Sequence, residues 1–251
     1  GNLWIEGNRI SLNNSNSVIP VISSGNINIV ANELIFGVNT PINITGGGSV
    51  NIRASELIFN NINNSNIRSN NSNVTINADY ISNMALEIIS SQVYVKSSRC
   101  ERLAGGTNSS LIVASSSGTA HFQSDGIVIS SQLVPFSVSG GSIINLTGQT
   151  YTSSTSLPNL QLFGPVSNMN LNMKTIVLAP TLAGGTFCDN SGAIVNANID
   201  ILTASNNNLA NCFLNTSGAS LVFGSDYVNL PCQLVTMSTG GAIINCTKCI
   251  I

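Results

Sequence analysis

The feature that most constrains this chain is a short string of alternating apolar residues that recurs along its first hundred positions. Each string has two apolar side chains two positions apart, then a small residue, then two more apolar side chains. The four clearest copies begin at Leu3, Ile27, Val50 and Val74, so the spacing between them is almost constant. Recurrence at a nearly fixed period of this size is the sequence signature of a repeat architecture.

Alternation with a period of two predicts β-strands with one buried face, and the small residue predicts a corner between two short strands. A helix does not fit, because the apolar positions do not recur with helical spacing. We therefore predict an all-β, single-stranded right-handed parallel β-helix (β-solenoid). Three short strands plus corners would need about 23–24 residues per coil, which matches the observed spacing.

Two further copies break the even spacing. A fifth copy starts at Leu86, only half a period after the fourth, and a sixth starts at Ala120, well beyond one full period from the fifth. The motif therefore either occupies different sides of the coil in different turns, or a loop interrupts the register near residues 96–119.

A longer repeat indicates duplication in the second half. Residues 122–129 are matched by 223–230, and residues 140–147 by 240–247, at offsets of 101 and 100. We predict two regions: 1–98, made of Asn-rich coils, and 99–251. The second continues the solenoid, contains the duplication (118–147 matching 218–247) and has a Cys-rich C-terminal end.

The composition excludes several classes of protein. Charged residues make up 7% of the chain and apolar residues 43%, while Asn and Ser number 37 and 36, so neutral groups must form the polar surface. A mean hydropathy of +0.29 and a net charge of −2 predict a folded chain. Eight scattered basic residues argue against nucleic acid as a partner, and the short apolar runs argue against a membrane span.

The cysteines indicate an oxidising compartment. Six are present, and we treat all of them as disulfide candidates: Cys100, Cys188, Cys212, Cys232, Cys246 and Cys249. The Cys246-x-x-Cys249 pair also permits a zinc site, but a second pair at matching spacing is missing and His121 is the only histidine. We expect no metal or other cofactor. Gly1 follows no leader, so we expect either a processed N-terminus or a piece of a longer precursor.

Residues 26–36 (NINIVANELIF) and 49–59 (SVNIRASELIF) resemble the repeats of filamentous-haemagglutinin-like adhesins and related right-handed β-helix surface proteins. The resemblance is best over residues 1–98. It implies a parallel β-helix displayed at a surface. The cysteines depart from the bacterial pattern and favour a disulfide-forming secretory route.

Asparagine has two interpretations in this chain. Nine sequons make candidate glycosylation sites: Asn13, Asn43, Asn63, Asn70, Asn73, Asn108, Asn145, Asn215 and Asn245. Composition alone gives about as many, so their number is no evidence of glycosylation. Asn side chains also bond to the backbone at turns and stack on their equivalents in the next coil.

Residues with catalytic chemistry are few. Glu33 and Glu56 occupy the same outward slot of successive motifs, which predicts a solvated ladder more readily than a catalytic pair. Asp125 and Asp226 are equivalent in the long repeat and are explained by turn formation. His121 has no counterpart, since Val222 fills its slot, so a Ser/His/Asp triad is not favoured. We predict that the chain is not an enzyme and has no catalytic residues.

We therefore expect a secreted structural protein, extracellular or at a cell or virion surface. The leading hypothesis is that the protein is a subunit of a fibre or coat. The subunits would associate end to end as a homopolymer, because the ends of a solenoid are sheet edges. The alternatives are an adhesin or virion-fibre module that recognises glycans and, third, a carbohydrate-active β-helix enzyme.

Overall fold

The computed structural model describes residues 1–12, 19–22, 24–37, 42–60, 67–103, 110–130, 134–155, 160–164, 166–179, 188–204, 211–217, 219–230, 233–237 and 240–250. For 19–22, 188–190, 211–217, 219–220 and 233–237 it describes the backbone alone.

Long and short strands alternate along the described chain and form two parallel sheets of eleven and ten strands, without a helix among these residues. The long strands are β1 (Asn2–Leu12), β3 (Asn26–Phe36), β5 (Ser49–Phe59), β7 (Asn73–Ser82), β9 (Gln92–Arg102), β11 (Thr119–Ile129), β13 (Ile143–Ser153), β15 (Asn168–Leu178), β17 (Ile194–Ala204), β19 (Ala219–Asn229) and β21 (Gly240–Ile250). The short strands are β2 (Ile19–Ile22), β4 (Ile42–Thr45), β6 (Ile67–Asn70), β8 (Leu86–Ile89), β10 (Ile112–Ser115), β12 (Phe136–Val138), β14 (Leu160–Phe163), β16 (Cys188–Ser191), β18 (Asn211–Ser217) and β20 (Gln233–Met237).

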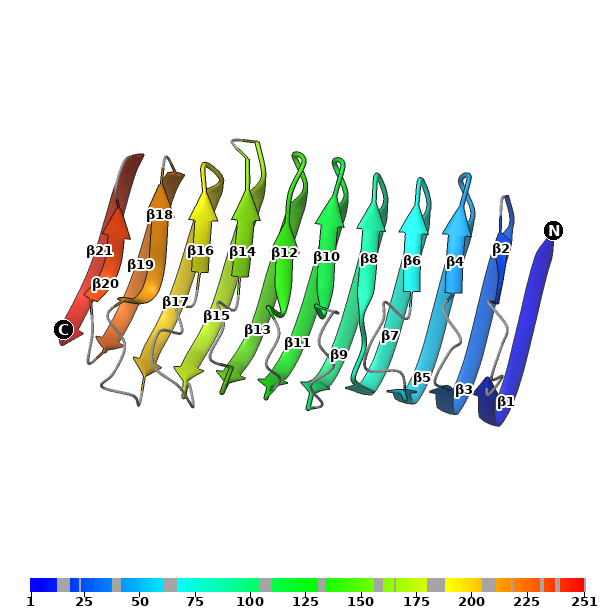
Figure 1. The fold of residues 1–251 in the computed structure, drawn as a ribbon. Helices are drawn as coiled ribbons and strands as arrows, with labels where there is room; N and C mark the ends of the chain where they lie inside the picture. Colours follow the sequence, from blue (N-terminus) through cyan, green and yellow to red (C-terminus); the bar gives the residue numbers. More distant parts are fainter. Residues whose placement is uncertain are drawn as a thin grey trace.

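One long and one short strand make a coil, and successive coils stack with the two termini at opposite ends of the rod (Figure 1). Asn2 pairs with Asn26, and Asn26 pairs with Ser49, so the register advances by one motif copy for each coil. The predicted parallel β-solenoid is confirmed. We number positions along the long strands by this register, with Asn2, Asn26 and their partners first.

Inward side chains stack into rows that form one continuous core between the two sheets. Leu34 and Leu57 pair in the ninth-position row and Phe36 and Phe59 in the eleventh, and all four are fully buried. The two phenyl rings stack with centroids 4.8 Å apart. Because parallel pairing puts equivalent residues side by side, each aliphatic residue packs on its counterpart one coil away.

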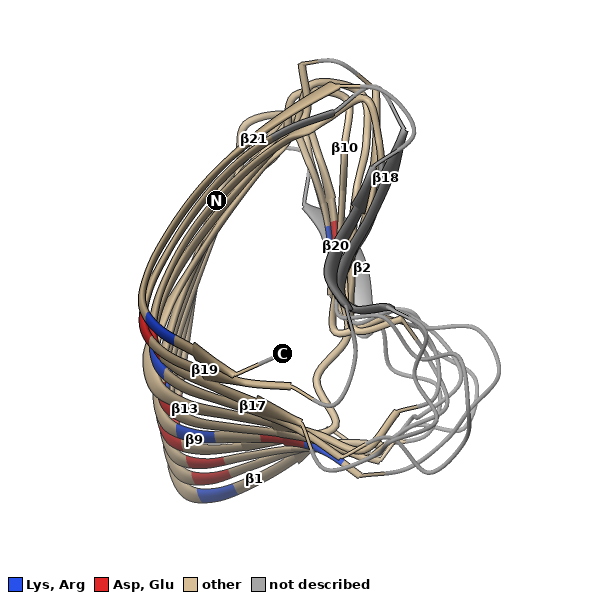
Figure 2. Cartoon of the chain, turned by 90° about the vertical axis from the view of Figure 1, so that its left-hand side faces the viewer, with Lys and Arg blue, Asp and Glu red and all other residues tan. Residues whose placement is uncertain are grey.

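Each long strand bends at its middle, as seen along the axis in Figure 2. Two short strands were predicted on either side of the small residue, whereas the structure has one strand of 10 or 11 residues. The ladder skips the seventh position: Ala31 pairs with Ala54 and Glu33 with Glu56, but Asn32 has no partner in the register. The bend is therefore accommodated within the strand.

From β4 to β17, a sharper corner links each short strand to the next long one. Its backbone enters the left-handed region at Gly46 and Gly47 (φ 70° and 88°) and at Gly140 and Gly141 (φ 59° and 76°). Other coils place residues such as Asn71 there, at φ 52°. Glycine has no Cβ to oppose this conformation, which explains why these pairs precede strands.

The fifth motif copy was misassigned. Leu86 and Ile88 belong to the short strand β8, whereas Val93 and Val95 belong to the next long strand, β9. The two strands alternate in the same way, so their junction resembled the bend of one long strand. The true inward residues at the end of β9 are Cys100 and Arg102, which broke the aliphatic pattern.

Candidate functional site

Two rows of outward side chains follow the axis of the long sheet. The third-position row runs from Trp4 through His121 to Ile243, and the fifth-position row runs from Glu6 to Asn245. We call the surface between them the axial groove. It contains three hollows of about 470, 470 and 360 Å³, and neighbouring hollows share lining residues.

Amide side chains form a hydrogen-bonded ladder in this groove. Asn170 Nδ2 donates to Asn145 Oδ1 at 2.7 Å, and Asn196 Nδ2 donates to Asn170 Oδ1 at 2.9 Å. In the fifth-position row, Asn198 Nδ2 donates to Asn172 Oδ1 at 3.3 Å. The stacking of asparagines that the sequence suggested therefore lies on the outside of the rod, without a charged side chain in this stretch.

Two aromatic rings continue the ladder toward the N-terminus. Tyr94 and His121 stack with centroids 4.7 Å apart and planes 2° from parallel. His121 Nδ1 lies 3.3 Å from Asn145 Nδ2, so it can accept a hydrogen bond. The sole histidine is therefore held between an aromatic ring and an amide, an arrangement different from a Ser/His/Asp triad.

Charged residues gather at the bend of the long strands (Figure 2). Glu33 and Glu56 pair in the register, which confirms that they share an outward slot. Arg9 precedes them in the same row and bonds Glu33 at 2.8 Å. This basic partner was not predicted, although Arg9 occupies the equivalent outward slot of the first motif copy.

A second polar cluster lies on β7 and β9 and was not predicted. Tyr80 Oη donates to Glu101 Oε2 at 2.9 Å, and Arg99 pairs with the same carboxylate. Partial burial, and then the hydrogen bond to Glu101, raise the pKa of the Tyr80 phenol. Each group in this cluster is engaged by a neighbour, as in a structural network.

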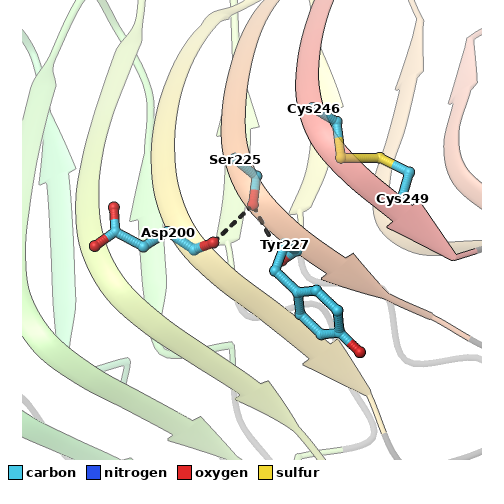
Figure 3. Close-up of a disulfide and its surroundings, with 5 residues drawn as sticks. All are labelled: Asp200, Ser225, Tyr227, Cys246 and Cys249. Atoms are coloured by element: carbon cyan, nitrogen blue, oxygen red, sulfur yellow. Dashed lines mark hydrogen bonds between the residues drawn. A yellow bond between two sulfur atoms is a disulfide. The ribbon is translucent and has the colours of Figure 1, made fainter.

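Asp125 and Asp226 occupy exposed seventh positions at the bend, directly after an inward serine. Beside Asp226, Ser225 Oγ lies 3.2 Å from the carbonyl oxygens of both Asp200 and Tyr227 (Figure 3). The serine hydroxyl can thus donate its hydrogen to either carbonyl oxygen at the bend, where the strand register skips the seventh position. Both aspartates therefore lie at the bend of a continuous strand, and not in the turn that the sequence predicted.

The cysteines fall into three groups. Cys246 and Cys249 form a disulfide within β21 (Figure 3), so this pair is a cross-link and not half of a zinc site. Cys100 differs from the prediction, because it is a free thiol in the inward ninth-position row between Ile81 and Ile127. The side chains of Cys188 and Cys212, and the whole of Cys232, lie outside the described residues.

The sequons occupy different surroundings. Asn70, Asn73 and Asn245 are exposed, whereas Asn145 is engaged in the amide ladder and the Oδ1 atom of Asn43 is buried. Three others and the side chain of a fourth lie outside the described residues: Asn13, Asn63, Asn108 and Asn215.

Within the described ranges, no three or more His, Cys, Asp or Glu side chains gather where they could hold a metal ion. The same ranges contain no helix with the length and apolarity needed to cross a membrane. Comparison of the chain with protein-family models, curated proteins and solved structures gave no match. The functional argument therefore depends on the chain's own geometry.

Proposed function

We propose that this chain is a non-enzymatic structural subunit of an extracellular fibre or coat, in which β-solenoid rods stack end to end. The observation that carries the proposal is the exposure of inward rows on the first and last strands of the described solenoid. Leu3 on β1 and Ile244 on β21 are 50% and 43% exposed, whereas Val50 and Ile52, in the same two rows within the rod, are fully buried.

The two ends are also complementary in their backbones. In the described sheet, β1 has a neighbour only in β3 and β21 only in β19, so each presents a row of unpaired N–H and C=O groups. A second copy placed with its β1 against β21 would continue the parallel sheet and cover the exposed apolar residues. Both backbone hydrogen bonding and apolar burial would favour this contact.

Two chemical features support an extracellular location. The Cys246–Cys249 disulfide persists most readily in an oxidising compartment. Asn70 and Asn73 lie in exposed sequons, where a glycan would project into solvent. Such a rod would carry a disulfide within β21 and sugar on its surface.

The test introduces a charge at each end of the full chain. Leu3→Lys and Ile244→Lys place an ammonium in the interface, which would have to be desolvated for a second copy to stack. Ile201→Lys is the matched control, because Ile201 is 38% exposed on the side of the rod. Electron microscopy and sedimentation velocity would compare the purified proteins over a range of concentrations.

We expect filaments or concentration-dependent oligomers from the unmodified chain and from Ile201→Lys, and monomers from the two end variants. Aligned filaments should diffract at about 4.8 Å along the fibre axis, the spacing between paired strands. A monomeric unmodified chain at every concentration would refute the proposal. Equal polymerisation of Leu3→Lys and Ile201→Lys would also refute it.

A further inference from the structure

We propose that the axial groove binds an extended, uncharged polysaccharide chain lying parallel to the rod, with Tyr94 as its main platform. This site goes beyond the structural role proposed above and does not depend on end-to-end assembly. It rests on the continuity of the groove, on its chemistry and on its repeat distance.

The groove is continuous over most of the rod. The hollow beside Trp4 shares Thr75 and Asn77 with the hollow beside Tyr94. The hollow beside Tyr94 in turn shares Asn145 and Thr147 with the one along the amide ladder. The eleven strands of the long sheet are separated by ten intervals of about 4.8 Å, so the groove is about 48 Å long. This length suits an oligosaccharide and is far longer than a small metabolite needs.

The amide ladder supplies polar groups that suit hydroxyls. Asn170 uses one N–H to reach Asn145 and accepts one bond from Asn196, which leaves it one amide hydrogen and one oxygen lone pair to offer. Each coil of the ladder thus presents a donor and an acceptor, repeated about every 4.8 Å along the axis. A sugar unit of an extended chain is of similar length and offers hydroxyls that donate and accept.

The aromatic pair supplies an apolar platform. Tyr94 stacks on His121 with one face, and the coil on its other side carries the much smaller Thr75 in the same row. The tyrosine is 44% exposed and lines the hollow there. An aromatic ring with a polar tip can pack against the C–H face of a sugar while its hydroxyl remains solvated.

The charge pattern selects the kind of polysaccharide. From Asn145 to Asn198, the described side chains that line the groove are all uncharged. Lys96 and Arg53 are the basic groups lining the other two hollows. They lie two coils apart in the fifth-position row, with Asn77 between them. Two cations separated by an amide do not form the continuous stripe that an acidic polymer requires, so a neutral chain fits best.

The experiment measures binding by calorimetry and affinity electrophoresis. The protein is the Leu3→Lys variant of the full chain, so that polymerisation and binding are read separately. The probes are unbranched glucose and N-acetylglucosamine oligomers, β-1,4- and β-1,3-linked, from disaccharide to decasaccharide, with an oligogalacturonate as the acidic comparison. We expect affinity for at least one neutral series to rise with length up to about the span of the groove.

Tyr94→Ala should weaken that binding about tenfold, because an aromatic stacking platform is lost. Tyr94→Phe should retain binding to within about twofold, which keeps the test valid if the alanine variant folds poorly. Tyr227→Ala is the matched control on another row of the same sheet and should bind as tightly as its parent. Failure to bind any neutral oligomer, binding of the acidic oligomer alone, or equal losses in Tyr94→Ala and Tyr227→Ala would each overturn the proposal.

Discussion

Gly148 provides a sharp test of the coil geometry, because its hydrogen lies against the backbone of the preceding coil. It occupies the inward sixth position of β13, paired with Ser124 and Met173. A Cβ built at Gly148 would lie 1.9 Å from the Ser124 carbonyl oxygen and 3.2 Å from Met173 Cε. The Gly148→Ala variant can fold only if that carbonyl shifts. Overpacking of this kind costs about 1–3 kcal/mol.

Gly126 is the matched control on the neighbouring strand. A Cβ there would meet Thr150 Oγ1 at 3.7 Å and the Ser98 carbonyl oxygen at 3.8 Å, which are ordinary contacts. Gly126→Ala should therefore stabilise the fold by about 0.4–1 kcal/mol, because alanine restricts the unfolded chain. The same restriction of the unfolded chain also stabilises Gly148→Ala. The difference in free energy of unfolding between the two variants therefore isolates the overpacking cost of about 1–3 kcal/mol.

Urea denaturation followed by circular dichroism would measure both free energies of unfolding. We expect Gly148→Ala to have the lower midpoint, with melting about 2–4 °C lower for each kcal/mol lost. If Gly148→Ala is as stable as Gly126→Ala, the close approach of the β11 backbone to Gly148 is wrong.

Two further predictions concern buried titratable groups. Burial raises the pKa of the Tyr151 phenol well above its ordinary range. Above about pH 10 the unfolded state therefore loses a proton that the folded state keeps. The free energy of unfolding should fall by up to about 1.4 kcal/mol per pH unit above that pH. Tyr151→Phe should make that decline shallower by up to about 1.4 kcal/mol per pH unit in urea titrations, and an unchanged slope would contradict the assignment. Burial also raises the pKa of the Cys100 thiol to about 12, so iodoacetamide at pH 8 should leave its peptide unlabelled in the native protein and label it fully in urea. Rapid native labelling, read by mass spectrometry, would show that this position of β9 is open to solvent.

The fold could be predicted from the inward residues because they repeat both in type and in spacing. Alternation around a small residue identified β1, β3, β5 and β7, and their even spacing implied a solenoid. The short sheet was not resolved as a second sheet, since a strand such as β4 has only two inward residues, Ile42 and Ile44. Two alternating residues cannot be distinguished from part of a neighbouring strand.

The neighbours of an outward side chain could be predicted only where the coil length is constant. Glu33 and Glu56 are separated by the regular period of the motif and were correctly placed side by side. The coil from Tyr94 to His121 is longer, and it begins where Cys100 and Arg102 replace the usual aliphatic pair. Outward residues have no repeating pattern of their own. Once one coil is misassigned, the outward neighbours in that coil can no longer be predicted from the sequence.

The same geometry explains why the chain has so few charges. Parallel pairing in register places each outward side chain beside its equivalent about 4.8 Å away. Two like charges at that distance repel by roughly 1 kcal/mol in water and several times more where the effective dielectric constant is near 20. A charged row would accumulate this cost at every coil. The pair Glu33 and Glu56 is tolerated with Arg9 bound at one end. Asparagine in the same register, as at Asn145, Asn170 and Asn196, donates to its neighbour instead of repelling it, so the 7% charged content and the amide-rich surface follow from the stacking of the coils.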